Sequence, residues 1–184
     1  MIKTLKVVAV LGFALAAQSI SSQAVTIGFG TAGGNFNPYV EGDFQVSTAQ
    51  LQNGNCATGA CLLLNTNSTS ILSLVSGGLF TLNSFWLKTQ GQPSVVNVEA
   101  FVGNTSAGFF SQIVPKNTAQ TISLLFADVT SIKFTDAGQG AIRIDDINVT
   151  AKVSAVPLPA GLPLLVSGLF GLGLLKRRRD KAQA

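Results

Sequence analysis

Few residues in this chain of 184 amino acids are suited to catalysis or to metal binding. Histidine is absent, which excludes histidine general bases, Ser-His-Asp and Cys-His nucleophile systems, and most zinc sites. The acidic residues are scattered, and no motif selects from them the two carboxylates that a glycosidase needs on opposite sides of a cleft. We therefore expect a protein that is not an enzyme and needs no cofactor. The alternative is an exported hydrolase that acts on polysaccharides.

Asp145 and Asp146 form an acidic pair that invites two interpretations. Together with Glu41 and Asp43 from an early segment, they could form a calcium cage of carboxylate oxygens. They also stand where the alternation of a predicted strand slips by one residue, and acids at such bulges are common without a metal. In this second interpretation, which we favour, one carboxylate faces solvent and the other accepts a hydrogen bond from a loop N–H. The pair is thus only a weak candidate for calcium.

Cys56 and Cys61 are the only cysteines, and they enclose four residues. In an oxidising compartment, two cysteines this close are expected to form a disulfide. A metal site would need more ligands than this pair offers, and a redox site more usually has Cys-x-x-Cys spacing. We predict a disulfide at the start of a strand that contains residues 62–64.

Trp86 and Tyr39 are the only residues of their kinds, and either ring could stack on a sugar. Trp86 lies inside an apolar run, which favours a position in the core.

Apolar residues alternate with period two through the body of the chain, and no window has a convincing helical stripe. The alternation is clearest over residues 96–102 and 141–150. Slips of one residue at 83–84 and 145–146 indicate β-bulges. About eight short strands, separated by Gly, Asn, Ser and Thr, predict an all-β fold with two sheets in a jelly-roll-like sandwich.

The N-terminus has the pattern of a signal peptide. Lys3 and Lys6 precede an uncharged apolar run over residues 7–17, and small residues occupy the positions before the junction of Ala24 and Val25. We expect cleavage between Ala24 and Val25. The alternative is an N-terminal membrane anchor, for which the run is short.

The C-terminus has the pattern of a single membrane span. Residues 156–175 contain no charge, and a helix of this length measures roughly 30 Å, the thickness of the hydrocarbon layer. The cluster that follows consists of Lys176, Arg177, Arg178 and Arg179. By the positive-inside rule this cluster stays cytoplasmic and acts as the membrane stop signal, with the body outside. A helix buried in the domain is the alternative, but it would place four cations against the core.

The positive charge of the chain resides mainly at its ends. Its formal charge is +4, yet residues 25–155 contain five basic and seven acidic residues and so carry a net charge of −2. Binding to nucleic acid requires a basic stripe on the folded domain. We therefore expect no nucleic-acid partner.

The C-terminal tail resembles a known sorting signal. Its motif consists of Val156, Pro157, Leu158, Pro159 and Ala160. Motif, apolar span and basic cluster occur in the order found in PEP-CTERM sorting signals, here in the VPLPA form with Leu158 in place of the common glutamate. The resemblance implies processing by an exosortase, a membrane cysteine protease-transpeptidase. It also implies delivery to the cell surface or an extracellular polysaccharide matrix after an inner-membrane intermediate.

The body is weakly similar to other exported PEP-CTERM proteins. Residues 80–87 and 142–149 resemble the middle and last strands of their galactose-binding-like sandwiches. This similarity suggests binding of carbohydrate. We expect a signal peptide over 1–24, an exported sandwich over 25–155 that binds glycan or a partner protein, and a sorting signal over 156–184. The expected partners are an exosortase-type enzyme, the membrane and exopolysaccharide.

We predict that the mature surface protein ends close to the motif and lacks the span 162–175. Proline fixes φ and biases the preceding residue toward extended structure, so residues 155–160 should offer a protease an accessible strip. A membrane helix has its backbone groups already paired. Mass spectrometry of the surface-exposed form checks this prediction. Recovery of peptides from residues 171–181 in that form would mean that the tail is a permanent anchor.

Overall fold

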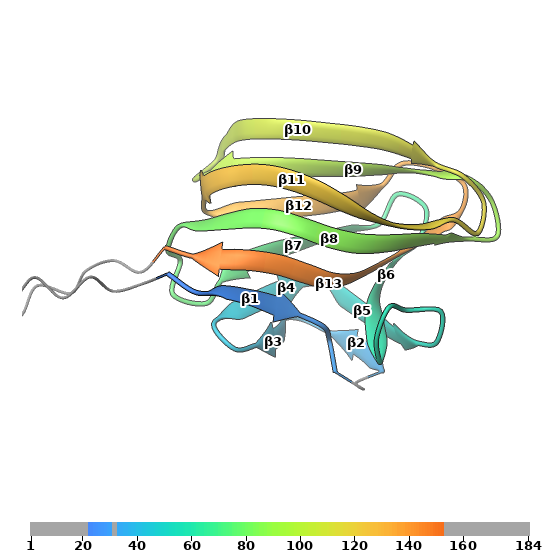
Figure 1. Ribbon diagram of the computed structural model, residues 1–184, viewed down its shortest axis with the longest axis horizontal. Helices are drawn as coiled ribbons and strands as arrows, with labels where there is room; N and C mark the ends of the chain where they lie inside the picture. The colour runs from blue at the N-terminus through green and yellow to red at the C-terminus, as the bar shows by residue number, and fades with distance from the viewer. Residues whose placement is uncertain (1–21, 31–32, 153–184) are drawn as a thin grey trace, which may run out of the picture.

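The computed structural model describes residues 22–30 and 33–152, which form two antiparallel β-sheets packed face to face (Figure 1). The predicted all-β sandwich is confirmed. Within the described residues, no helix is long and apolar enough to cross a membrane. The sorting motif, the predicted span and the basic cluster lie outside the described residues. So does the signal peptide up to residue 21.

The two sheets are built from thirteen strands in the described part of the chain. These are β1 (Ala24–Ile27), β2 (Gly34–Phe36), β3 (Tyr39–Glu41), β4 (Phe44–Ser47), β5 (Ala49–Asn53), β6 (Ala60–Leu64), β7 (Thr69–Leu74), β8 (Phe80–Gln90), β9 (Ser94–Val102), β10 (Thr105–Val114), β11 (Ala119–Val129), β12 (Ser131–Asp136) and β13 (Ala141–Ala151). The first sheet has the order β11-β8-β13-β6-β5-β2, with β1 also paired to β13. The second sheet has the order β10-β9-β12-β7-β4-β3.

The prediction of about eight strands was too low because the early strands are short. Strands β1 to β5 have only three to five residues each. β2 reads Gly-Asn-Phe and β3 reads Tyr-Val-Glu, and neither buries a side chain fully. Such segments acquire their strand conformation from pairing with longer neighbours rather than from their own residues.

A single apolar core lies between the sheets and takes every second side chain of the long strands. Aromatic pairs join the two layers across it. Phe85 of β8 meets Phe134 of β12 edge to face with ring centroids 5.3 Å apart. Phe44 of β4 meets Phe80 of β8 in the same way at 5.4 Å. Such pairs contribute about 0.5–1.5 kcal/mol beyond the burial of their area.

Both predicted bulges are present. The register between β8 and β13 shifts between Asp145 and Asn148, and again between Asn148 and Val149, where β8 advances from Ser84 to Leu82. Each bulge turns the side chains that follow it to the opposite face of the strand relative to a strict alternation.

The expectation that Trp86 lies in the core was wrong. Phe85 and Leu87 are completely buried, so the alternation of β8 directs Trp86 to the outer face of the first sheet, where it is half-buried. An apolar run of three residues in a strand cannot place all of them on one face.

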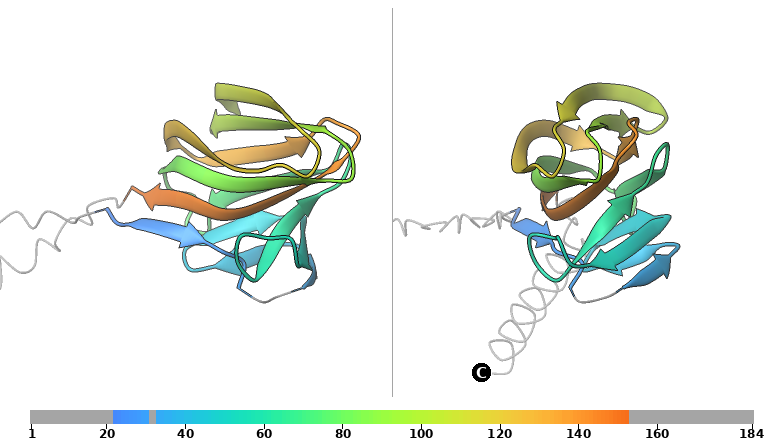
Figure 2. Two further views of the ribbon diagram at one scale, coloured as in Figure 1. Left: turned by 45° about the vertical axis from the view of Figure 1, so that its right-hand side comes forward. Right: turned by 90° about the vertical axis from the view of Figure 1, so that its right-hand side faces the viewer.

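Strands β10 and β11 are edge strands of the two different sheets, and both lie toward the same side of the sandwich (Figure 2). Gly108 of β10 lies close to β11, because a Cβ at that position would lie 2.8 Å from the ring of Phe126. The absence of a side chain at Gly108 thus leaves room for this ring.

We predict that Gly140→Ala destabilises the domain by about 1–3 kcal/mol, the usual cost of forcing extra volume into a packed site. A Cβ on Gly140 would overlap the carbonyl oxygen of Gln92, in the turn that joins β8 to β9. Gly78→Ala is the matched control, because its Cβ would have an ordinary contact of 3.4 Å with Leu74. Chemical denaturation of both variants measures the effect, and equal stability of the two would contradict this account of Gly140.

Candidate functional site

A hollow of about 360 Å³ opens at one end of the first sheet. Its lining residues are polar: Asn55, Lys88, Thr89, Gln90 and Asn117. We call this set the polar hollow. Strand β8 supplies three of the five residues, the loop after β5 supplies Asn55, and the loop between β10 and β11 supplies Asn117. Three segments distant in sequence therefore converge on one place.

Strand β13 places Arg143 directly beside this site, because Arg143 is the register partner of Lys88. The Arg143 side chain is only 3% exposed. Its Nε and Nη2 atoms donate hydrogen bonds to Gln90 Oε1 over 3.1 and 2.5 Å, and its Nη1 atom donates to Cys61 Sγ over 3.8 Å. Burial lowers the pKa of this guanidinium, but arginine stays charged at neutral pH.

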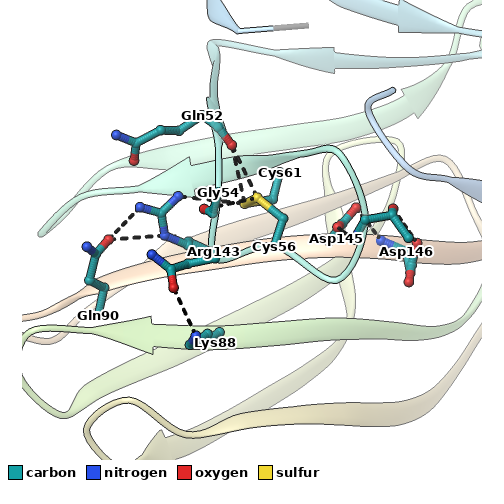
Figure 3. Close-up of a disulfide and its surroundings, with 11 residues drawn as sticks. Gln52, Gly54, Cys56, Cys61, Lys88, Gln90, Arg143, Asp145 and Asp146 are labelled. Atoms are coloured by element: carbon teal, nitrogen blue, oxygen red, sulfur yellow. Dashed lines mark hydrogen bonds between the residues drawn. A yellow bond between two sulfur atoms is a disulfide. The ribbon is translucent and has the colours of Figure 1, made fainter. Parts of the chain in front are cut away.

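Hydrogen bonding fixes which atoms of the amide side chains remain available. Gln90 Oε1 is occupied by Arg143, so the Gln90 amide group is left as a donor (Figure 3). Lys88 Nζ donates to Asn55 Oδ1 over 3.2 Å, which in the same way leaves the Asn55 amide group as a donor. The polar hollow is therefore rich in hydrogen-bond donors.

The predicted disulfide is confirmed: Cys56 and Cys61 are bonded. Cys61 is the second residue of β6 and is fully buried, so the bond ties the loop of residues 54–59 to the sheet at the start of that strand. This loop carries Asn55, and the disulfide that closes it lies next to Arg143 (Figure 3). A short closed loop of this kind stabilises a fold by on the order of 2 kcal/mol.

Asp145 and Asp146 lie on the other side of the disulfide loop from Arg143 (Figure 3). Asp145 is fully buried, and its Oδ2 accepts a hydrogen bond of 2.8 Å from the Thr58 N–H. Asp146 is half-buried, and its Oδ1 accepts from the Thr58 hydroxyl over 3.3 Å. The interpretation in which one carboxylate meets a loop N–H is confirmed for Asp145.

The alternative calcium cage is not assembled. Glu41 accepts hydrogen bonds from the backbone N–H groups of Gly28 and Phe29 and from the Tyr39 hydroxyl. Asp43 lies in the exposed turn between β3 and β4. Among residues 22–30 and 33–152, no three cysteine or acidic side chains converge as metal ligands. The carboxylates of Glu41, Asp145 and Asp146 each accept hydrogen bonds from protein donors instead.

Tyr39, considered as a sugar-stacking ring, is engaged within the fold. Its ring packs against Phe29 and Phe36 with centroids 5.5 Å away in each case. Burial and the hydrogen bond to Glu41 raise the pKa of Tyr39 to about 12. Trp86 remains the available aromatic, since it precedes Lys88 by two residues and both point to the outer face of β8.

None of the residues of the polar hollow, nor Arg143, stood out in the sequence. In the structure, Asn55 and Asn117 have positive φ angles of 58° and 55°, a backbone conformation that asparagine adopts more readily than most residues. Convergence depends on the pairing of β8 with β13, and that register cannot be read from either strand alone.

A second hollow of about 320 Å³ lies near β2, lined by Asn35, Phe36, Asn37, Thr48, Ala49 and Gln50. Neither hollow has a carboxylate in its lining.

No protein-family model matches this chain, and no curated protein matches it. Solved structures with a similar arrangement include a family 29 carbohydrate-binding module from Piromyces equi, at 11% identity and a TM-score of 0.43 over 76% of this chain and 97% of the module. A family 11 carbohydrate-binding module of Clostridium thermocellum has 15% identity and a TM-score of 0.38 over 74% of this chain and 98% of the module.

An arabinose-bound α-L-arabinofuranosidase has 10% identity and a TM-score of 0.45 over 70% of this chain. The present chain spans only 27% of that enzyme. At such identities and TM-scores, these similarities carry no argument about what this protein binds.

We predict that the stability of Asp145→Asn, measured relative to the native protein, increases as pH rises from about 3.5 to neutral. The Asn side chain loses one of the two backbone N–H bonds that the carboxylate accepts, and this loss is the same at every pH. Burial raises the pKa of Asp145, although hydrogen bonds from Thr58 and Asp146 oppose this. The unfolded chain therefore ionises at a lower pH than the folded one, so the native protein loses stability as pH rises through the folded pKa. Thermal unfolding of both proteins across this pH range measures the stability of the variant minus that of the native protein. A value that falls as pH increases would contradict the prediction.

Proposed function

We propose that this protein is a non-catalytic, glycan-binding component of the cell envelope or extracellular matrix, exported and sorted through its C-terminal tail. The observation that carries the proposal is the polar hollow, where amide and ammonium donors converge, together with Trp86, which lies two residues from Lys88 on the same outer face of β8. Sugars are bound by such combinations, because hydroxyl groups take hydrogen bonds and ring faces stack on aromatic side chains.

The rigidity of the site supports binding without a large cost in ordering side chains. Lys88 and Gln90 lie on a strand that is paired on both sides. Lys88 is held by its hydrogen bond to Asn55, and Gln90 is held by its hydrogen bonds from Arg143. The loop that carries Asn55 is closed by the disulfide.

The lining residues argue against the alternative of an exported hydrolase. A glycosidase needs two carboxylates at the scissile bond, and the two hollows described above contain none. The adjacent Asp145 is fully buried beneath Thr58 and is not available to a substrate.

The position of the hollow also suits a protein tethered at its C-terminus. Ala141 pairs with Gln90 at one end of the β8–β13 ladder, while Ala151, close to the expected tail, pairs with Phe80 at the other. Eleven residues of strand separate these ends by about 33 Å. We propose that the tail holds the domain at the inner membrane until exosortase processing, with the polar hollow directed away from the lipid.

We predict that Trp86→Ala weakens glycan binding by about tenfold, because loss of a central aromatic contact usually costs more than 1 kcal/mol. The full-length protein in detergent is first tested against an array of bacterial and plant polysaccharides, and affinities are then measured for the glycans that bind. Phe109→Ala is the matched control, since this aromatic ring is 62% exposed on the outer face of the second sheet.

Equal losses in the two variants, or a loss in Phe109→Ala alone, would contradict the proposed site. A native protein that binds no glycan would contradict the function. Release of new reducing ends from a bound polysaccharide would revive the hydrolase.

A further inference from the structure

The cations of the domain are distributed unevenly between paired and unpaired positions. Lys133 forms an ion pair with Glu99 at 3.5 Å, and Lys152 forms one with Asp128 at 2.9 Å. The other three cations in the described residues are Lys88, Lys116 and Arg143, and none of them has an ion pair within residues 22–30 and 33–152.

Two of these three cations lie at or next to the polar hollow. Lys88 lines it, and Arg143 is the register partner of Lys88 and donates hydrogen bonds to the lining residue Gln90. The third, Lys116, immediately precedes the lining residue Asn117 in the chain. The domain as a whole is acidic, with a net charge of −2 over residues 25–155. A concentration of unpaired positive charge at one hollow is therefore a local feature rather than a consequence of composition.

The buried guanidinium strengthens the field of this site. Arg143 is 3% exposed, so water screens its charge poorly. Asp145 follows two residues later on the same strand, but it lies across the disulfide loop and accepts its hydrogen bonds from Thr58 and Asp146. A charge left without a counter-ion in a poorly solvated place attracts an anion from outside.

The hydrogen-bonding groups have the same bias. The acceptor oxygens of Gln90 and Asn55 are occupied by Arg143 and Lys88, which leaves the two amide groups and the remaining ammonium protons as donors. A neutral sugar hydroxyl is bound best by a mixture of donors and acceptors, whereas an oxyanion only accepts.

We propose that the polar hollow selects an acidic polysaccharide, with an oxyanion on the sugar ring, a uronate carboxylate or a sulfate ester, bound by Lys88 and the amide groups of Asn55 and Gln90. This inference rests on the proposed glycan binding and narrows its ligand class. Arg143 acts behind the site, as a positioning residue that orients Gln90 and as a fixed source of positive potential.

The experiment compares polymers that differ only in charge. Polygalacturonate is tested against its fully methyl-esterified form, and dextran sulfate against dextran, at low ionic strength where screening is weak. Every protein compared is the full chain in detergent with Lys176, Arg177, Arg178 and Arg179 replaced by glutamine, so that the basic tail cannot bind the polyanion. We expect the charged member of at least one pair to bind about tenfold more tightly.

Lys88→Gln should abolish most of this preference, and Lys133→Gln should retain it. The two substitutions change the net charge equally, but Lys133 is paired with Glu99 on the outer face of the second sheet. Preference for polygalacturonate identifies the carboxylate, and preference for dextran sulfate alone identifies the sulfate; either supports the inference. Thermal unfolding of each variant confirms that the fold is intact.

Equal binding of charged and uncharged polymers would overturn this inference. If Trp86→Ala still weakened the binding of these polymers, the proposed function would stand. An equal effect of Lys88→Gln and Lys133→Gln would also overturn it, since only net charge would then matter. Failure to bind any of the four polymers, combined with no binding on the glycan array, would remove the proposed function and this inference together.

Discussion

The antiparallel ladder between β8 and β13 organises both the core and the polar hollow. β8 contributes Phe80, Phe85 and Leu87 to the core with no exposed surface. The same pairing brings Lys88 opposite Arg143 and Gln90 opposite Ala141 on the polar side. A slip of one residue in this register would exchange the two faces of the strand, so core packing and the composition of the hollow are specified by one constraint.

The alternation of apolar residues was enough to predict the sandwich, and the one-residue slips at 83–84 and 145–146 were enough to predict its bulges. The close spacing of Cys56 and Cys61 predicted their disulfide, given an expected export to an oxidising compartment. The short early strands and the side of β8 on which Trp86 lies were not predicted correctly. Both depend on the partner strand, which decides the pairing of a weak segment and which residues take the core positions.

Arg143 shows why the candidate site could not be anticipated. In the sequence it is one cation in an alternating strand, and exposure would be the ordinary expectation. In the structure it is buried, and its charge is met by the amide oxygen of Gln90 and a sulfur of the disulfide rather than by a carboxylate. Burying a cation on such partners costs stability. The proposed binding of an anion would offset part of this cost, because the anion would supply the counter-charge that Arg143 lacks.

The position of β13 in the first sheet also governs when the domain can fold. β13 pairs with β8 along one side and with β1 and β6 along the other, so it joins β8 and β11 to the remaining strands of that sheet. Among the described strands it is also the last to be synthesised. Within the described part of the chain, β1 has no strand to pair with until residues 147–150 have been made. Contacts between segments so far apart in sequence form late. If the chain is exported, as proposed, the first sheet would be completed as residues 156–175 reach the translocation channel. Release of this expected span into the membrane and closure of the sandwich would then take place together.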